Sequence, residues 1–198
     1  MKERSAFISA ISYGTASVFT QVLMMVYLII VAQWLGAEKY AYIAAAYAAT
    51  AFSSFLFSWG FNEWLMKTGA TISDIEGLGG SVIRLKALLG VVWGGVLWIG
   101  LRLIRPELYL NSVIILTIIE VWFDSTFGTL LALLILKSRA QLASVLLTLS
   151  RLLRMLALIF LMVLGSKSVT LVLLVRLITT IVFFLLAWAF VKPKLMGD

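Results

Sequence analysis

Long apolar segments alternate with short polar breaks along the whole chain, and this alternation predicts its fold. The breaks contain glycine, proline or charged residues, as in Gly36-Ala-Glu-Lys39 and Lys137-Ser-Arg139. A helix needs about 20 mainly apolar residues to cross a bilayer, and each apolar segment has that length. The pattern predicts six transmembrane helices over about residues 7–35, 40–60, 81–104, 108–136, 142–164 and 169–191. We therefore expect an all-α membrane protein in which residues 1–198 form a single six-helix lobe.

The longest break, Lys67 to Gly80, is rich in glycine and polar residues, so it predicts a connecting segment on the cytoplasmic side. The distribution of Lys and Arg predicts the orientation. With the N-terminus in the cytoplasm, these basic residues fall inside: Lys2, Arg4, Lys67, Arg84, Lys86, Lys137, Arg139, Lys192 and Lys194. Fewer fall outside: Lys39, Arg102, Arg105 and Lys167. The excess inside favours this orientation, with both termini cytoplasmic.

Composition supports a membrane protein and excludes several kinds of site. Apolar residues make up 63% of the chain and the mean hydropathy is +1.09, well above the usual values of a soluble domain. The chain has no Cys and no His, which excludes disulfides, thiolate or imidazole metal ligands and histidine-based catalysis. We expect no cofactor and no metal. The net charge of +7 favours contact with anionic lipids rather than with nucleic acid.

Two predicted helices carry charged residues at the depth of the bilayer. The fourth contains Glu120 and Asp124, which are four residues apart and therefore share a helical face. The fifth contains Arg151 and Arg154. The two helices should form a hairpin that turns near Ser138, and counting outward from this turn brings Asp124 to the depth of the two arginines. We therefore predict an ion pair between Asp124 and Arg151 or Arg154.

Two interpretations of these charges stay open, and they are compatible. In the first, a structural salt bridge neutralises the charges and holds the helices together. In the second, the charges line a partly hydrated cavity, where the arginines bind an anionic group and Glu120 and Asp124 bind a coupling cation. Arg176 in the sixth helix shares a face with Thr180. Arg176 either lines the same cavity or extends its long side chain outward to the membrane surface.

Two sequence blocks resemble a known family. The first is Ala32-Gln-Trp-Leu-Gly-Ala-Glu-Lys-Tyr40, and the second is Phe57-Ser-Trp-Gly-Phe-Asn-Glu-Trp-Leu-Met-Lys-Thr-Gly69. Both are similar to the N-terminal lobe of the polysaccharide-biosynthesis flippases, which transport O-antigen and lipid-linked oligosaccharides and belong to the multidrug/oligosaccharidyl-lipid/polysaccharide exporter superfamily. The family usually has glycine where this chain has Ala41. The segment from Asp124 to Arg151 also resembles the family's fourth and fifth helices.

The resemblance implies a transporter that moves a polyprenyl-pyrophosphate-linked sugar across the bacterial inner membrane by alternating access. Members of the family have two six-helix lobes around a central cavity. This chain would then be an N-terminal lobe, either a fragment or a half-size protein that pairs with a second lobe or with another copy. In such a transporter, cationic groups in the cavity meet the pyrophosphate and acidic sugars. The resemblance carries this substrate-binding role to Arg151, Arg154 and Arg176.

Two other functions are compatible with the sequence. A membrane scaffold or assembly subunit would have no transport activity of its own. A membrane enzyme of glycan or lipid synthesis would need catalytic side chains that are scarce here. Acid-phosphatase-type enzymes need histidines, and phospholipid-synthesising transferases use a dense array of aspartates, whereas this chain has only Asp74, Asp124 and Asp198. We therefore expect a transport protein and not an enzyme.

Overall fold

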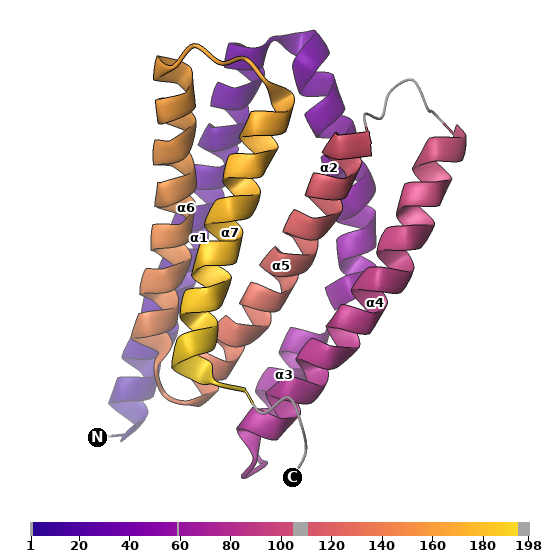
Figure 1. The fold of residues 1–198 in the computed structure, drawn as a ribbon. Coiled ribbons are helices and arrows are strands. Elements are labelled where there is room, and N and C mark those ends of the chain that lie inside the picture. The colour runs from indigo at the N-terminus through magenta and orange to yellow at the C-terminus, as the bar shows by residue number, and fades with distance from the viewer. Residues whose placement is uncertain (1, 59, 105–110, 194–198) are drawn as a thin grey trace.

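The computed structural model of the chain is helical throughout the residues it describes. It describes the backbone of residues 2–58, 60–104 and 111–193 and the side chains of residues 13–51, 60–103 and 112–193. Within these ranges there are seven helices and no strand (Figure 1). They are α1 (Lys2–Leu35), α2 (Ala37–Ser58), α3 (Phe61–Gly69), α4 (Ile75–Ile104), α5 (Asn111–Leu136), α6 (Ala140–Val163) and α7 (Val169–Val191).

Five helices in the described part of the chain are long and apolar enough to cross a membrane. Their candidate spans are Tyr13–Leu35, Ile75–Leu103, Ser112–Leu136, Ala140–Val163 and Val169–Val191. The expected class, a multi-pass helical membrane protein, is therefore confirmed at this level. The predicted second span corresponds to α2, which is not among the five. The start of the predicted span at residue 108 lies outside the described residues.

The breaks between helices differ from the predicted ones. The predicted break at Gly36–Lys39 is a single non-helical residue, Gly36, whose φ of 81° lets the chain reverse direction before α2 begins. The predicted connecting segment from Lys67 to Gly80 is wrong over most of its length, because α3 continues to Gly69 and α4 already begins at Ile75. Asp74 supports this early start, since its Oδ1 accepts a hydrogen bond of 3.1 Å from the backbone N–H of Gly77.

The long helices run alternately up and down the bundle, and the start of α1 and the end of α7 lie at the same end (Figure 1). Lysine side chains join elements at both ends. At the end where α1 begins and α7 ends, Lys137 in the α5–α6 turn pairs with Glu76 at 2.6 Å and donates to the Val191 carbonyl of α7 at 2.9 Å. At the opposite end, Lys39 donates to the Lys167 carbonyl at 2.9 Å, which joins the start of α2 to the α6–α7 connection.

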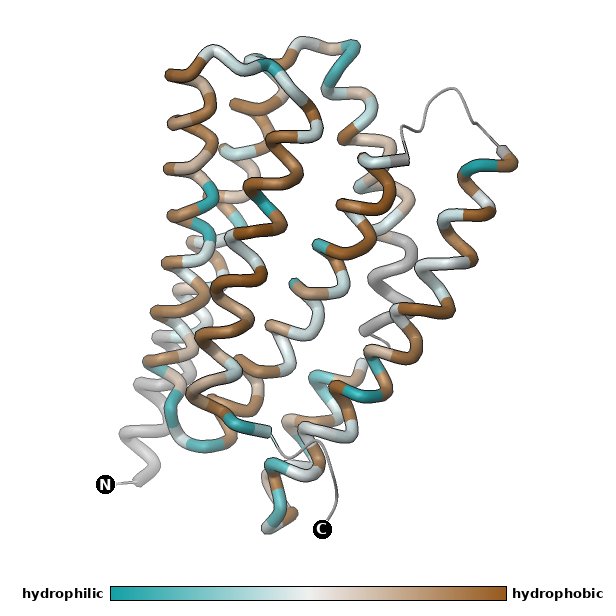
Figure 2. Tube along the Cα trace, viewed as in Figure 1, coloured by the Kyte–Doolittle hydropathy of each residue, from teal (hydrophilic) through white to brown (hydrophobic). Residues whose placement is uncertain are grey.

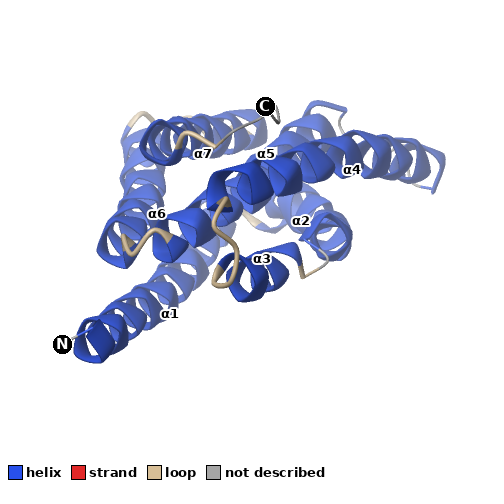
Figure 3. Cartoon of the chain, turned by 90° about the horizontal axis from the view of Figure 1, so that it is seen from below, coloured by secondary structure: helices blue, strands red, loops and turns tan. Residues whose placement is uncertain are grey.

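Helix α5 is the centre of the bundle. Seen along the bundle it lies between α6 and α7 on one side and α2, α3 and α4 on the other, and it packs against all five (Figure 3). Its position explains why its sequence is apolar around the whole circumference except for a few polar residues. Groups on α5 can therefore interact with nearly every other part of the fold.

The core is divided into two apolar clusters that lie at different depths of the bundle. One cluster, near the end where α1 begins and α7 ends, combines residues such as Leu130, Ala143 and Phe183 of α5, α6 and α7. The other, near the opposite end, combines residues such as Val113, Leu158 and Val172 of the same three helices together with side chains of α1 and α2. The segments between the two clusters hold polar and charged side chains, so the interior is layered: apolar, polar, apolar.

Glycines allow α4 to approach α5 closely. A Cβ atom built at Gly90 would overlap the indole ring of Trp122, and the ring is held in place because its Nε1 donates to the Lys86 carbonyl at 3.1 Å. Small residues at such contacts are a general device of membrane helix packing. Gly95 on the same helix has no atom within 4 Å of the corresponding position.

Replacing Gly90 by Ala should therefore destabilise the fold by about 1–3 kcal/mol, because the overlap forces Trp122 or α4 to move. The matched change Gly95→Ala should leave the stability unchanged or raise it slightly, since Ala favours helix and meets no neighbour there. Free energies of unfolding in detergent micelles provide the comparison. Equal stability of the two variants would show that α4 and α5 do not pack as closely as described.

Candidate functional site

Charged side chains gather at mid-depth of the bundle, between the two apolar clusters. Asp124 on α5 and Arg151 on α6 are close to the midpoints of their candidate spans, and Thr180 is close to the midpoint on α7. Hydrophilic segments interrupt the otherwise hydrophobic α5, α6 and α7 at this height (Figure 2). We call the side chains of Glu120, Asp124, Arg151, Arg154 and Arg176 the charged layer.

The predicted ion pair of the α5–α6 hairpin is present in the structure, with both arginines. Asp124 Oδ1 lies 2.8 Å from Arg154 Nη2 and 3.1 Å from Arg151 Nη1. Arg151 also donates from Nη2 to the second carboxylate oxygen of Asp124 at 3.2 Å. The turn between the helices lies at Ser138 as predicted, where φ is 59°. Asp124 thus accepts from two guanidinium groups that are nearly one helical turn apart on α6.

Arg176 does not extend outward to the membrane surface, as one interpretation allowed. It is buried, and its Nε donates to Glu120 Oε1 at 3.2 Å. Its guanidinium carbon lies 4.4 Å from the ring centroid of Tyr47 and 5.5 Å from that of Tyr27, a cation–π arrangement with α2 and α1. The Tyr47 hydroxyl is 3.5 Å from the second oxygen of Glu120. Arg176 turns inward because an acidic partner lies within its reach.

Arg154 joins these two groups into one network. Its Nη2 donates to Thr180 Oγ1 at 2.6 Å, and its Nη1 lies 3.5 Å from Glu120 Oε1. The charges therefore alternate without a gap in the order Arg151, Asp124, Arg154, Glu120, Arg176. Three arginines and two carboxylates give the layer a formal net charge of +1. Two buried nitrogens of Arg154, Nε and Nη1, have no hydrogen-bond partner, so its donors are not fully used.

One edge of the charged layer is accessible, whereas its other end is closed. The side chains of Asp124 and Arg151 are 32% and 15% exposed, whereas those of Arg154 and Glu120 are 1% and 2% exposed. With 3.6 residues per turn, Arg151 lies on the side of α6 opposite to its exposed apolar stripe. That stripe consists of Val145, Leu149, Leu153, Leu156 and Phe160. The accessible edge thus faces away from the surface that α6 presents to lipid.

The accessible edge also faces away from the exposed apolar residues of α5. Next to the edge, α6 carries two further polar residues. Asp124 lies on the side of α5 opposite to the exposed Ile115 and Ile119. On α6, Ser144 and Thr148 follow Arg151 at helical spacing toward the α5–α6 turn. Ser144 is buried and donates its hydroxyl to the Ala140 carbonyl at 2.9 Å, whereas Thr148 is partly exposed. The partly enclosed Arg151 therefore has one accessible hydroxyl group nearby, and the pair could hold a hydrated anion.

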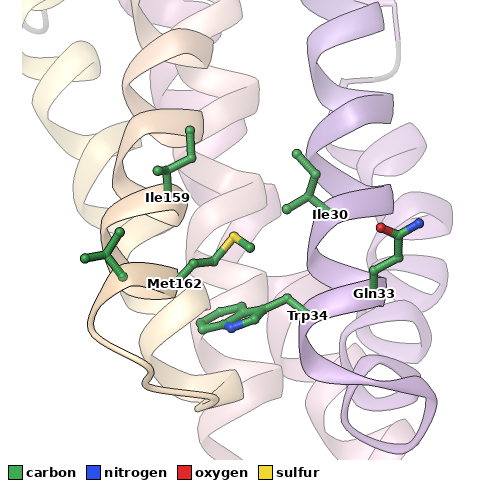
Figure 4. Close-up of a pocket in the computed structure, with 6 residues that line it drawn as sticks. Ile30, Gln33, Trp34, Ile159 and Met162 are labelled. Atoms are coloured by element: carbon green, nitrogen blue, oxygen red, sulfur yellow. The ribbon is translucent and has the colours of Figure 1, made fainter.

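The structure also contains an apolar groove of about 630 Å³ between α1 and α6, close to the α6–α7 connection (Figure 4). Its lining residues are Ile30, Gln33, Trp34, Ile159, Met162 and Val163. None of them is charged, so this groove does not offer the chemistry that an anion requires. Among the described residues no group of three or more acidic residues is placed to hold a metal ion.

A second buried polar centre was not predicted. Lys86 was assigned to the cytoplasmic end of a helix that was expected to begin at Ser81, but α4 begins at Ile75, about 9 Å earlier along its axis. Lys86 is completely buried between α3, α4 and α5, and it donates to Asn62 and Ser125. The signal that could have revealed it is the helix start at Asp74, which places Lys86 three turns inside α4.

Comparison of the chain with family models, with curated proteins and with solved structures found no match. The roles of these residues are therefore argued from their own geometry.

Glu120 should be the most important single charge for stability, because it is enclosed and serves both Arg176 and Arg154. Glu120→Leu leaves the buried Arg176 without a carboxylate, and we expect a loss of about 3–5 kcal/mol of unfolding free energy. The combination of Glu120→Leu with Arg176→Leu should recover most of this loss, since neither charge then remains unpaired. Asp124→Asn, at the accessible edge, should cost less. Unfolding free energies of the unmodified protein, of Glu120→Leu, of Arg176→Leu and of the double variant would be additive if the pair were not coupled.

Proposed function

We propose that this chain is a six-pass lobe of a transporter that moves an anionic lipid-linked oligosaccharide across the bacterial inner membrane. The observation that carries the proposal is the partly exposed Asp124–Arg151 pair at mid-depth of apolar helices. The resemblance of the blocks at Ala32–Tyr40 and Phe57–Gly69 to polysaccharide flippases gives the substrate class. No chemistry of bond cleavage is needed, and the proposed activity is transport alone.

An ionised pair with exposed surface at the membrane centre is costly unless water or a polar ligand meets it. A clamp that only held helices together would be expected to enclose both partners, as the fold does with Glu120 and Arg176. The edge at Asp124 and Arg151 instead faces away from the exposed apolar stripe of α6 and from the exposed Ile115 and Ile119 of α5. This difference favours a hydrated path or a bound anion at that edge.

The proposal includes α2 as the sixth pass. Its 22 residues correspond to about 33 Å, enough for the hydrocarbon core, and the helix lies within the bundle beside α4 and α5. With six passes, both termini lie on one side, and the excess of Lys and Arg at that side favours the cytoplasm. Its Ala- and Tyr-rich composition fits a helix packed inside a lobe, since small residues permit close approach.

The proposed roles follow the accessibility of each charge. Arg151 makes the first contact with the pyrophosphate, because its planar guanidinium can bind two phosphate oxygens at once. Arg154 and Arg176 contribute once the carboxylates that now hold them move. Asp124, released from Arg151 by the incoming anion, still pairs with Arg154, so it would take up a proton or a coupling cation only after Arg154 has moved away as well. Glu120 is the second acidic group available for such a role, although it is enclosed in this conformation.

One lobe offers one wall of a transport path, so the proposal requires a second six-helix lobe or another copy of this chain. Anionic lipids are the other expected partners, through the lysines and arginines at the ends of the helices. The competing function is a scaffold or assembly subunit, in which the charged layer would act only as a structural clamp. The complete pairing of Arg176 with Glu120 is the observation that favours this alternative.

Cysteine labelling tests the six-pass arrangement on a chain that has no native cysteine. Arg4→Cys, Ser73→Cys and Arg139→Cys should react with a membrane-impermeant reagent only from the cytoplasmic side. Lys39→Cys and Lys167→Cys should react only from the opposite side. Labelling of Arg4→Cys and Ser73→Cys from opposite sides would show that α2 does not cross the membrane.

Ligand binding tests the role of Arg151. Polyprenyl pyrophosphate added to the protein in nanodiscs should bind about tenfold or more weakly to Arg151→Leu, because a charged hydrogen-bonding group is lost. Arg151→Lys should show a smaller loss, since the charge stays but the planar geometry does not. Asp124→Asn should bind more tightly, because Arg151 no longer has a competing carboxylate.

Two controls make the result specific. Arg102→Leu removes an exposed arginine that contacts the Trp98 ring outside the charged layer, and binding should stay unchanged. Polyprenol without phosphate should not distinguish the Arg151 variants. If Arg151→Leu and the unmodified protein bound the pyrophosphate with equal affinity, the charged layer would have only a structural role. This result would favour the alternative function of a scaffold or assembly subunit.

A further inference from the structure

The apolar groove between α1 and α6 has the lining of a site for a hydrocarbon chain. Both helices line it with residues at positions i, i+3 and i+4, which share a helical face: Ile30, Gln33 and Trp34 on α1, and Ile159, Met162 and Val163 on α6. Trp34 and Met162 extend toward each other across the groove (Figure 4). Both of them, and Ile30, pack against the apolar cluster at this end of the bundle, which forms the floor.

The groove opens toward lipid and has to be filled. Ile159 and Val163 are 46% and 80% exposed, so one wall is part of the surface that α6 presents to the membrane. An empty groove would deprive its lining atoms of contacts, and water would find few polar partners there. At about 30 Å³ for a group of the size of water, the 630 Å³ of the groove hold roughly twenty methylene groups. This space fits one chain of a phospholipid, whereas the much longer chain of a polyprenyl carrier would extend beyond it.

Positive charge lies just beyond the groove. Because α1 ends at Leu35 and α6 at Val163, the groove occupies the last turns of both helices. Lys39 follows α1 and Lys167 follows α6, and the Lys39 ammonium donates to the Lys167 carbonyl at 2.9 Å. Both lysine side chains are exposed, and no acid of the described residues lies within ion-pair distance of either. Glu38, their neighbour in sequence, lies in the first turn of α2, whose positive end stabilises its carboxylate.

We propose that the groove and these two lysines form a binding site for one anionic phospholipid of the phosphatidylglycerol class. One acyl chain lies in the groove, and the phosphate lies at Lys39 and Lys167. Trp34 is then at the level of the lipid glycerol, the depth at which tryptophan is enriched in membrane proteins. The site is separate from the charged layer, and the inference does not rest on the proposed transport.

Charge favours a lipid over a second copy of the chain as the occupant of this groove. A copy with the same orientation in the membrane would bring its own Lys39 and Lys167 to the same depth, where like charges repel. A lipid phosphate compensates them instead. The bound lipid would also link the connection after α1 to the connection after α6, which already meet through Lys39.

Quenching of tryptophan fluorescence by brominated acyl chains tests the proposal. The whole chain is placed in phosphatidylcholine vesicles, and brominated phosphatidylglycerol or brominated phosphatidylcholine replaces part of the lipid. The difference between the unmodified protein and Trp34→Phe isolates the signal of Trp34 from those of the other tryptophans. Trp34 should select phosphatidylglycerol about fivefold or more over phosphatidylcholine, since one lysine near an anionic headgroup contributes about that factor.

Charge variants locate the selectivity. Combined Lys39→Gln and Lys167→Gln should reduce the preference for phosphatidylglycerol to about one. Arg102→Gln removes an exposed cation at the same end of the bundle, on α4, and should leave the preference unchanged. Equal quenching of Trp34 by the two lipids in the unmodified protein would overturn the proposal, and so would a preference that survives the double lysine change.

Variants that fill the groove test where the chain lies. Ile159→Phe and Val163→Phe should lower the quenching of Trp34 by both brominated lipids, because the added ring occupies the space of the acyl chain. Val145→Phe, at an exposed position of α6 outside the groove, should have no such effect. Unchanged quenching in the two groove variants would overturn the proposal.

Other occupants give different results. Absence of Trp34 quenching by either lipid, together with a cross-linked dimer, would assign the groove to a second copy. Polyprenyl phosphate that displaced brominated phosphatidylglycerol better than the unbrominated lipid does would assign it to the carrier. Either result would overturn the proposal. Arg151→Leu should leave the quenching unchanged, so the outcome for this groove is independent of the outcome for the proposed transport.

Discussion

A charge in the middle of a membrane has to be met by another group, and this constraint organises the fold. Lipid offers no compensation, so the five ionised side chains of the charged layer are matched within the bundle itself. Because they come from α5, α6 and α7, each pair also sets the relative height of two helices. A shift of α6 along α5 by one turn would separate Asp124 from Arg154 and leave the enclosed Arg154 without its shortest ion pair. The ion pairs therefore determine the relative heights of α5, α6 and α7, which apolar side chains alone would not fix.

The two apolar clusters depend on this register. Membrane helices gain little from excluding water, since lipid tails are as apolar as leucine, and they associate through close packing and polar contacts. Packing of Leu130 against α7 at one end and of Leu158 against α1 at the other requires that the helices meet at fixed heights. The close approach of Gly90 to Trp122 adds the same requirement between α4 and α5. Polar and apolar layers thus reinforce each other along α5.

The sequence predicted the helical membrane class and the ion pair of Asp124, because both depend on local rules. The class follows from the length of the apolar runs. The pair follows because residues at equal distances from the tight turn at Ser138 lie at the same depth on the two helices. It did not predict that α4 begins at Ile75, since the glycines before Ser81 resemble a loop until Leu133 of α5 is seen to pack against Gly79. This error concealed the depth of Lys86. The inward direction of Arg176 could not be read either, because its partner Glu120 lies 56 positions away and the rings of Tyr27 and Tyr47 come from two other helices.

The charged layer has one more positive than negative charge, and an anion can reach this excess positive charge only at the accessible edge. At the enclosed end, Glu120 serves two arginines and two tyrosines surround Arg176, so little donor capacity is left for a ligand. At the accessible end, Arg151 depends on a carboxylate that is itself one-third exposed. An anion that reaches this edge competes with Asp124 for Arg151, and if it also draws Arg154 away, the carboxylate is left to bind a proton or a cation. In the proposed transporter, the interaction that stabilises the empty lobe would therefore also couple substrate binding to ion binding.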